Sequence, residues 1–220
     1  RYEGLEVLLA DTKRSLPWVR SQLAKTGDSA ARLVLASILC MYGEKEAAPV
    51  VAEAVREKKE WDEGWHYTGM GQFGMCLSQL DALIMALGNA KDPISLAVVL
   101  EKAKLLCPED YFSHYRAIAE AAEAIGSEEA VRVLSMLLTA PGVRYHSLND
   151  YVEARRETVP DMEDTSTRNI ALKELHLARA LYLCGDKDGI GRAVLERYAK
   201  GLQGHYARYA YEVLQSKKQD

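Results

Sequence analysis

The sequence predicts an all-α fold, and three features lead to this prediction. Alanine (29) and leucine (28) make up about a quarter of the 220 residues, whereas phenylalanine occurs only twice, a balance that favours helices over sheets. An apolar helical segment that ends at a glycine and is followed by a second helical segment occurs four times. The four glycines, Gly43, Gly88, Gly126 and Gly185, are separated by 45, 38 and 59 residues. The first two spacings are close to the period of HEAT-type helical hairpins. We therefore expect one domain over residues 1–220, a HEAT-like α-α superhelix of about five helical hairpins.

The predicted helices follow one another with short connections. Two short helices are expected over residues 3–11 and 16–26, and Pro17 lies early in the second, where proline is tolerated. The four repeated units follow at residues 35–55, 80–103, 118–137 and 177–198. The third spacing is longer because residues 141–165 form an insertion, with a short helix expected over residues 147–157. A last helix over residues 206–214 would cap the array.

The first helix of each unit carries apolar residues eight, five, four and one positions before its glycine. This spacing places them on one helix face, which we expect to be buried. We also expect each glycine to form the left-handed C-cap of its helix. The stripe residues are Leu35, Ile38, Leu39 and Tyr42; Leu80, Leu83, Ile84 and Leu87; Ile118, Ala121, Ala122 and Ile125; and Leu177, Ala180, Leu181 and Cys184.

Charge and hydropathy exclude two classes of partner. The net charge is −4 and neither half of the chain is basic, so no nucleic-acid surface is expected. The longest apolar run, residues 33–42, is about half the length that a membrane-spanning helix needs, so no membrane span is expected. Because the chain begins at Arg1, we expect it to be a piece of a longer protein, and its compartment is not indicated.

The four cysteines, Cys40, Cys76, Cys107 and Cys184, are far apart and form no C-x-x-C pair. Buried free thiols are the expectation, since cysteine in an apolar helix behaves as a small hydrophobic residue. Disulfides or metal binding are the alternatives.

Residues 61–74 (WDEGWHYTGMGQFG) differ from their surroundings, because they hold four of the fifteen glycines and two of the three tryptophans. Gly69, Gly71 and Gly74 match the G-x-G-x-x-G dinucleotide fingerprint, but the buried strand that this motif requires does not precede them. We therefore interpret the glycines as a sharp bend between helices. The segment is the most favoured functional surface, because irregular segments on a rigid scaffold often bind ligands. The rings of Trp61 and Trp65 could stack on a sugar or flavin ring. Alternatively, they fill the space between hairpins as a hydrophobic plug.

Three helix starts share a His-Tyr pair, and arginine follows two of them. In a stacked array these starts lie at one edge, where helix N-termini and cationic side chains attract anions. This edge is a candidate docking surface for an acidic or phosphate-bearing partner; alternatively, the same residues cap helices and tie neighbouring hairpins together. The candidate interaction surface comprises Trp61, Trp65, His66, Tyr67, His114, Arg116, Arg168, Asn169, His205 and Arg208.

The sequence offers little for catalysis. It contains no G-x-S-x-G, H-E-x-x-H or P-loop motif. Asp186 and Asp188 begin like a calcium loop, but the later ligands are missing. We assign no catalytic, cofactor-binding or metal-binding residue to this chain.

Four segments carry a resemblance to a known family. They are EWDEGWHYTGMGQFGMCLSQLDALIMALG (60–88), FSHYRAIAEAAEAIG (112–126), DTSTRNIALKELHLARALYLCGD (164–186) and GHYARYAYEVL (204–214). They resemble the C-terminal helical-repeat region of bacterial FAD-dependent oxidoreductases. The resemblance implies that FAD is bound by an N-terminal Rossmann-type domain of the parent protein, not by this region. It assigns no catalytic role to any residue of this chain.

Three functional hypotheses follow. The first is a non-catalytic accessory domain of an FAD-dependent oxidoreductase, which docks on its own N-terminal flavin domain or on another protein. The second is a free-standing HEAT-type scaffold that binds a protein along its concave face. The third is an α-helical enzyme, a polysaccharide lyase or hydrolase, that uses tyrosine, histidine and arginine side chains around residues 61–74. A deep cleft that holds His66, Tyr67, His114 and a carboxylate within hydrogen-bond reach would favour it.

Overall fold

The computed structural model describes residues 10–64, 78–157 and 165–217, and these ranges are all-helical. They contain eleven α-helices and one short 3-10 turn, with no strand. The prediction of an all-α protein is therefore confirmed. The α-helices are α2 (Thr12–Lys25), α3 (Ser29–Met41), α4 (Ala48–Glu57), α5 (Gln79–Ala90), α6 (Pro93–Ala103), α7 (Phe112–Ile125), α8 (Glu129–Thr139), α9 (Tyr151–Glu157), α10 (Ser166–Cys184), α11 (Ile190–Ala199) and α12 (Gly204–Ser216), and the 3-10 turn η1 is Lys45–Ala47.

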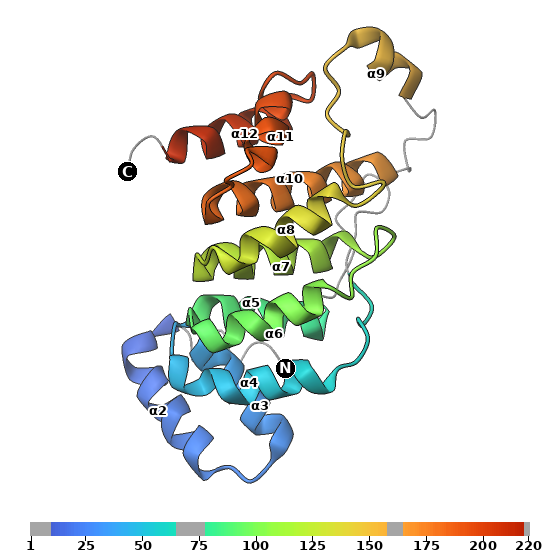
Figure 1. Cartoon of the computed structure of the whole chain (residues 1–220). Helices are drawn as coiled ribbons and strands as arrows, with labels where there is room; N and C mark the ends of the chain where they lie inside the picture. Colours follow the sequence, from blue (N-terminus) through green and yellow to red (C-terminus); the bar gives the residue numbers. More distant parts are fainter. Residues whose placement is uncertain (1–9, 65–77, 158–164, 218–220) are drawn as a thin grey trace.

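The helices stack in two rows (Figure 1). In the first row α3, α5, α7 and α10 follow one another, each against the next. In the second row α4 lies against α6, and α6 against α8. Helix α2 closes the N-terminal end on α3, and α11 and α12 follow α10 at the other end. Helix α9 projects away from the stack together with the connection that precedes it (Figure 1).

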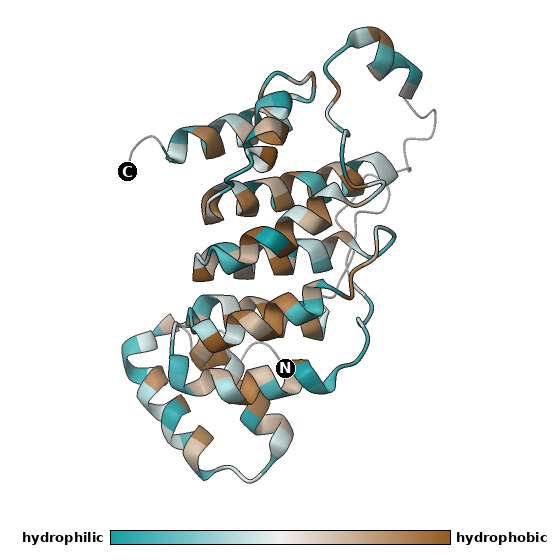
Figure 2. Cartoon of the chain, viewed as in Figure 1, coloured by the Kyte–Doolittle hydropathy of each residue, from teal (hydrophilic) through white to brown (hydrophobic). Residues whose placement is uncertain are grey.

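One continuous apolar core runs between the two rows. This core extends from Val19 on α2 to Val213 on α12. Both apolar and polar residues occur along the helices that surround it (Figure 2). The stripe positions of α5 and α10 are all buried, as predicted, and those of α7 are buried except for Ile125, which is half-buried. The stripe of α3 is less complete, because Leu35 is half-buried and Tyr42 is 41% exposed.

Three of the four predicted glycine caps have the expected left-handed backbone. Gly126 (φ +70°) and Gly185 (φ +111°) are the C-caps of α7 and α10, and Gly43 (φ +84°) follows the end of α3. The prediction is wrong for Gly88, because α5 continues to Ala90 and Lys91 (φ +52°) takes the left-handed position.

The helix boundaries differ modestly from the expected ones. Helix α2 begins four residues before the predicted start, because the carboxylate of Asp11 accepts a hydrogen bond from the backbone N–H of Arg14 and caps the helix. Helix α9 begins at Tyr151 rather than at residue 147. At this start the carboxylate of Asp150 accepts hydrogen bonds from the backbone N–H groups of Val152 and Glu153. The predicted helix over residues 3–11 lies almost wholly outside the described residues.

The cysteines partly follow the expectation. Cys40 and Cys184 are buried thiols, and burial raises their pKa to about 12 and about 11. Cys107 is exposed, so burial is the wrong expectation for it, and Cys76 lies outside the described residues. Every helix of the described ranges is too short or too polar to cross a lipid bilayer.

Candidate functional site: the edge of the stack and the α10–α12 groove

His114, at the start of α7, is one of the residues of the predicted docking edge, and its side chain is 1% exposed. Its Nδ1 lies 2.7 Å from Asp81 Oδ1 on α5, and its Nε2 lies 3.1 Å from the carbonyl oxygen of Asp62. The expectation that His114 belongs to an accessible surface is therefore wrong. The histidine instead joins α5, α7 and the connection after α4, which is the alternative role that the sequence left open.

The connection after α4 lies flat against the start of α7. The ring of Trp61 is half-buried against the core and stacks on His114 at 4.3 Å between ring centroids. A Cβ placed on Gly64 would lie 2.5 Å from Cβ of Tyr111, so only glycine fits there. Trp61 therefore fills the space between helices, as the plug interpretation proposed, and its ring is already stacked on a neighbour. Trp65, His66, Tyr67, Gly69, Gly71 and Gly74 lie outside the described residues.

The connection between α6 and α7 is held at the same edge by two buried side chains. The hydroxyl of Tyr115 donates to the carbonyl oxygen of Cys107 at 2.8 Å, and Nζ of Lys173 donates to the carbonyl oxygen of Pro108 at 2.7 Å. Burial lowers the pKa of Lys173, and Asp110 opposes this effect. Both side chains therefore donate to backbone carbonyl groups of this connection and tie it to α7 and α10.

Glu174 on α10 holds the connection between α8 and α9. Its carboxylate, 1% exposed, accepts hydrogen bonds from the backbone N–H groups of Tyr145 and His146, each at 2.9 Å, and from the hydroxyl of Tyr198 at 2.9 Å. Two successive N–H groups point at one anion because Tyr145 adopts a left-handed backbone, with φ of +76°. Sequence reasoning missed Lys173 and Glu174, although two adjacent charges within the apolar stripe of a helix were a visible signal.

A groove with mixed polar and apolar walls opens between α10 and α12, and we name it the α10–α12 groove. Its first cavity, of about 220 Å³, is bordered by Arg168 and His205, two of the predicted residues. The other lining residues are Leu172, Leu175, His176, Tyr206 and Tyr209. A second cavity, of about 200 Å³, shares Tyr209 and is otherwise lined by Arg179, Leu183, Glu212, Val213 and Ser216.

The groove exists because α12 does not continue the first row closely. Helices α5, α7 and α10 pack against one another along their lengths, whereas α12 packs mainly on α11 and contacts α10 much less. Large side chains, chiefly Tyr209, bridge the remaining distance. The described face between α10 and α12 is hollowed along these two helices.

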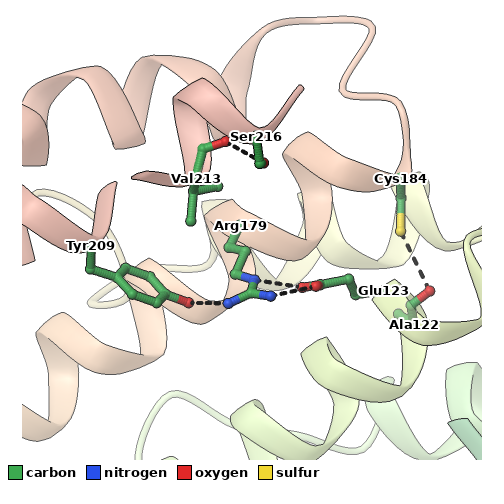
Figure 3. Close-up of polar contacts among 7 residues, drawn as sticks. All are labelled: Ala122, Glu123, Arg179, Cys184, Tyr209, Val213 and Ser216. Carbon is green, nitrogen blue, oxygen red and sulfur yellow. Dashed lines mark hydrogen bonds and ion pairs between the residues drawn. The ribbon is translucent and has the colours of Figure 1, made fainter. Parts of the chain in front are cut away.

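Arg179 fixes one wall of the groove (Figure 3). Its guanidinium donates two hydrogen bonds to the carboxylate of Glu123 on α7, at 2.8 and 2.7 Å, and one to the hydroxyl of Tyr209 at 3.3 Å. The bond to Glu123 raises the pKa of Arg179, and burial raises the pKa of Tyr209. The bidentate ion pair thus joins α10 to α7, a geometry that gives such pairs their strength, and the hydrogen bond to Tyr209 joins α10 to α12.

His176 lies at the base of the first cavity and remains neutral. Burial, together with the positive charges of Arg116 and Arg179, lowers its pKa to about 3. Its ring lies 5.5 Å from that of Phe112 and 6.2 Å from that of Tyr209, between ring centroids. The cavity therefore offers a neutral imidazole among aromatic rings, with cationic groups around it.

The structure brings together only part of the predicted surface. Arg168 and His205 share the first cavity, and Arg116 is close enough to act on His176 through its charge. Asn169 is half-buried, and its amide donates to the Thr165 hydroxyl at 3.4 Å. Arg208 is exposed on α12, outside the lining of either cavity.

The burial of His114 also bears on the third functional hypothesis. The lyase or hydrolase hypothesis needed His114 in an open cleft, and the burial of this side chain removes that support. Within the described ranges, no group of three or more histidine, cysteine, aspartate or glutamate side chains is placed to hold a metal ion. Comparisons with protein-family models, with curated proteins and with solved structures each found no match.

Proposed function

We propose that this chain is a HEAT-like helical-repeat module that binds a segment of another protein in the α10–α12 groove. The two rows of helices support the HEAT-like interpretation, because stacked helical pairs bury one continuous core and present extended surfaces. The observation that carries the binding proposal is the groove itself, hollowed between α10 and α12 and stiffened by the Glu123–Arg179–Tyr209 hydrogen bonds.

The size of the two cavities favours side chains of a partner over a whole cofactor. Each cavity measures about 200 Å³, whereas sites for drug-sized molecules span about 300–1,000 Å³. The cationic Arg168 and the imidazole of His205 lie at the first cavity, and Glu212 lies at the second. A partner segment with a carboxylate beside an apolar side chain fits the first cavity, where leucine side chains and aromatic rings adjoin the guanidinium of Arg168.

The test is selection of peptides by the whole chain. From a displayed library of random 12-residue peptides, we expect enrichment of sequences that carry aspartate or glutamate next to a large apolar residue. Arg168→Glu should remove this binding because it reverses the charge at the first cavity. The exposed Tyr211 lies on α12 but lines neither cavity, so Tyr211→Ala is the matched control and should bind as the wild type does. Enrichment of no peptide, or of peptides that bind all three proteins equally, would contradict the proposal.

A second candidate function rests on the quoted sequence segments. They favour an accessory module of an FAD-dependent oxidoreductase, in which the partner is the flavin domain of the same parent chain. The visible spectrum of the purified parent protein, recorded with and without residues 1–220, tests this candidate. A flavin spectrum that weakens on deletion supports a module that stabilises the flavin site, and the absence of flavin in the parent protein refutes the oxidoreductase assignment.

A further inference from the structure

A basic pocket lies at the other end of the stack, where α4 ends beside α6. It has a volume of about 310 Å³. Its lining residues are Arg56, Lys58, Lys59, Val98, Glu101, Lys102 and Leu105. Four cations thus surround one carboxylate, although the chain as a whole has a net charge of −4. Such a local excess of positive charge attracts anions.

Lys102 is the most unusual member of this pocket, because lysine is rarely buried and this side chain is 5% exposed. Its Nζ donates a hydrogen bond to the carbonyl oxygen of Lys58, at the C-terminal end of α4. Burial lowers the pKa of Lys102, and the negative charge of Asp62 opposes this effect only in part. An ammonium group has three N–H donors, so the contact with Lys58 uses only one of those of Lys102, which is also a lining residue of the pocket.

The other three cations of the pocket, Arg56, Lys58 and Lys59, have few ion pairs with acidic side chains. Arg56 has a single ion pair, with Glu53 at 3.5 Å on the solvent-exposed face of α4. Lys58 and Lys59 are exposed, and neither has an ion pair within the part of the chain that the structure describes. The C-terminus of α4 attracts cations through its helix dipole, which accounts for Arg56 and Lys102. Lys58 is the C-cap of α4 and Lys59 follows it, so the dipole favours these two lysines as well, and all four cations border one open cavity.

We propose that this pocket binds a phosphate or pyrophosphate group carried by a small molecule. A compact dianion matches the charge of the pocket, and lysine is a common ligand of phosphate groups. The volume lies at the lower limit of small-molecule sites, about 300 Å³. The exposed side chain of Leu105, together with Val98, gives the pocket an apolar wall for an organic part of the ligand. This inference is independent of the α10–α12 groove and of the function proposed for it.

The probes are inorganic phosphate, pyrophosphate, glycerol phosphate and phenyl phosphate, with acetate as a monovalent reference. Each is titrated into the full chain by calorimetry at low and at physiological ionic strength. We expect pyrophosphate to bind more tightly than phosphate, and acetate to bind least. Tighter binding of phenyl phosphate than of inorganic phosphate identifies an ester as the ligand, and equal binding identifies the free ion.

The variant Lys58→Glu/Lys59→Glu leaves the Lys58 carbonyl, and therefore the contact with Lys102, in place. It should weaken pyrophosphate binding by a factor of about 10 or more, since each charge-assisted contact contributes about a factor of 10. The matched control, Lys13→Glu/Lys25→Glu, changes the net charge equally at exposed lysines of α2. No binding by the wild type, binding of acetate as tight as that of pyrophosphate, or equal losses in both variants would overturn the proposal.

Discussion

Gly88 of α5 lies directly against Ala121 of α7. A Cβ on Gly88 would be 2.5 Å from Cα and 2.8 Å from Cβ of Ala121, closer than two such carbon atoms approach. The absence of a side chain therefore sets the distance between these neighbouring helices. The same pair explains why a glycine stands at this position although it does not end its helix.

Substitution of Gly88 should therefore destabilise the protein. We expect Gly88→Ala to lower the free energy of unfolding by about 1–3 kcal/mol, the usual effect of an overpacked contact, despite the better helix propensity of alanine. Urea denaturation measures this difference. A Cβ on Gly27 would meet no atom within 4 Å, so Gly27→Ala is the control and should change stability little. A Gly88→Ala protein as stable as the wild type would mean that α5 and α7 separate easily.

The buried contact between His114 and Asp81 should contribute to stability rather than to partner binding. We expect His114→Ala to lower the free energy of unfolding by about 2–4 kcal/mol, because the buried Asp81 carboxylate loses its partner and a cavity remains. Thermal and urea unfolding measure this loss. His205 is exposed, and His205→Ala should change stability by less than about 0.5 kcal/mol. Similar losses in both variants would show that the Asp81–His114 contact has no special structural role.

The ion pair between Arg179 and Glu123 should hold α12 in place through Tyr209. We expect Arg179→Ala to lower stability by about 1–3 kcal/mol, since the pair is bidentate and partly buried. Amide hydrogen exchange should accelerate in α12 more than in α5. Arg192 forms an exposed pair with Glu196 within α11, and Arg192→Ala should change stability by less than about 0.5 kcal/mol. Unchanged exchange in α12 would contradict the bridging role of Arg179.

His176 should make the protein less stable as the pH falls from about 6.5 towards 3. Its folded-state pKa is lowered to about 3 from the ordinary histidine value of 6.5, so between these pH values the unfolded chain binds a proton that the folded chain does not. The contribution is constant above pH 6.5 and decreases below it, by at most about 1.4 kcal/mol per pH unit. Urea unfolding of the wild type and of His176→Gln at pH 7 and pH 5 measures the effect. The wild type should lose more stability than the variant, and equal losses would refute the assignment.

The candidate site could be predicted only in part. Arg168 and His205 were found from their place at helix starts, and the fold brings them to one cavity. Arg179 and Tyr209, which stiffen the groove, were missed because each follows the ordinary spacing of a helix surface. The basic residues around Lys102 belong to charged segments of two helices, and their shared pocket depends on how α4 and α6 pack.

The sequence by itself determined the local structure of this protein: the helical class, the helix order, and the left-handed caps at Gly126 and Gly185. These features depend on residues within one or two turns of each other, so periodicity and backbone preference suffice. Only the tertiary structure decided which polar side chains became internal partners. Lys102 meets a carbonyl 44 residues away, and Glu174 meets an N–H group 29 residues away. Their burial is favourable only where those distant backbone groups arrive, a condition that no local pattern contains.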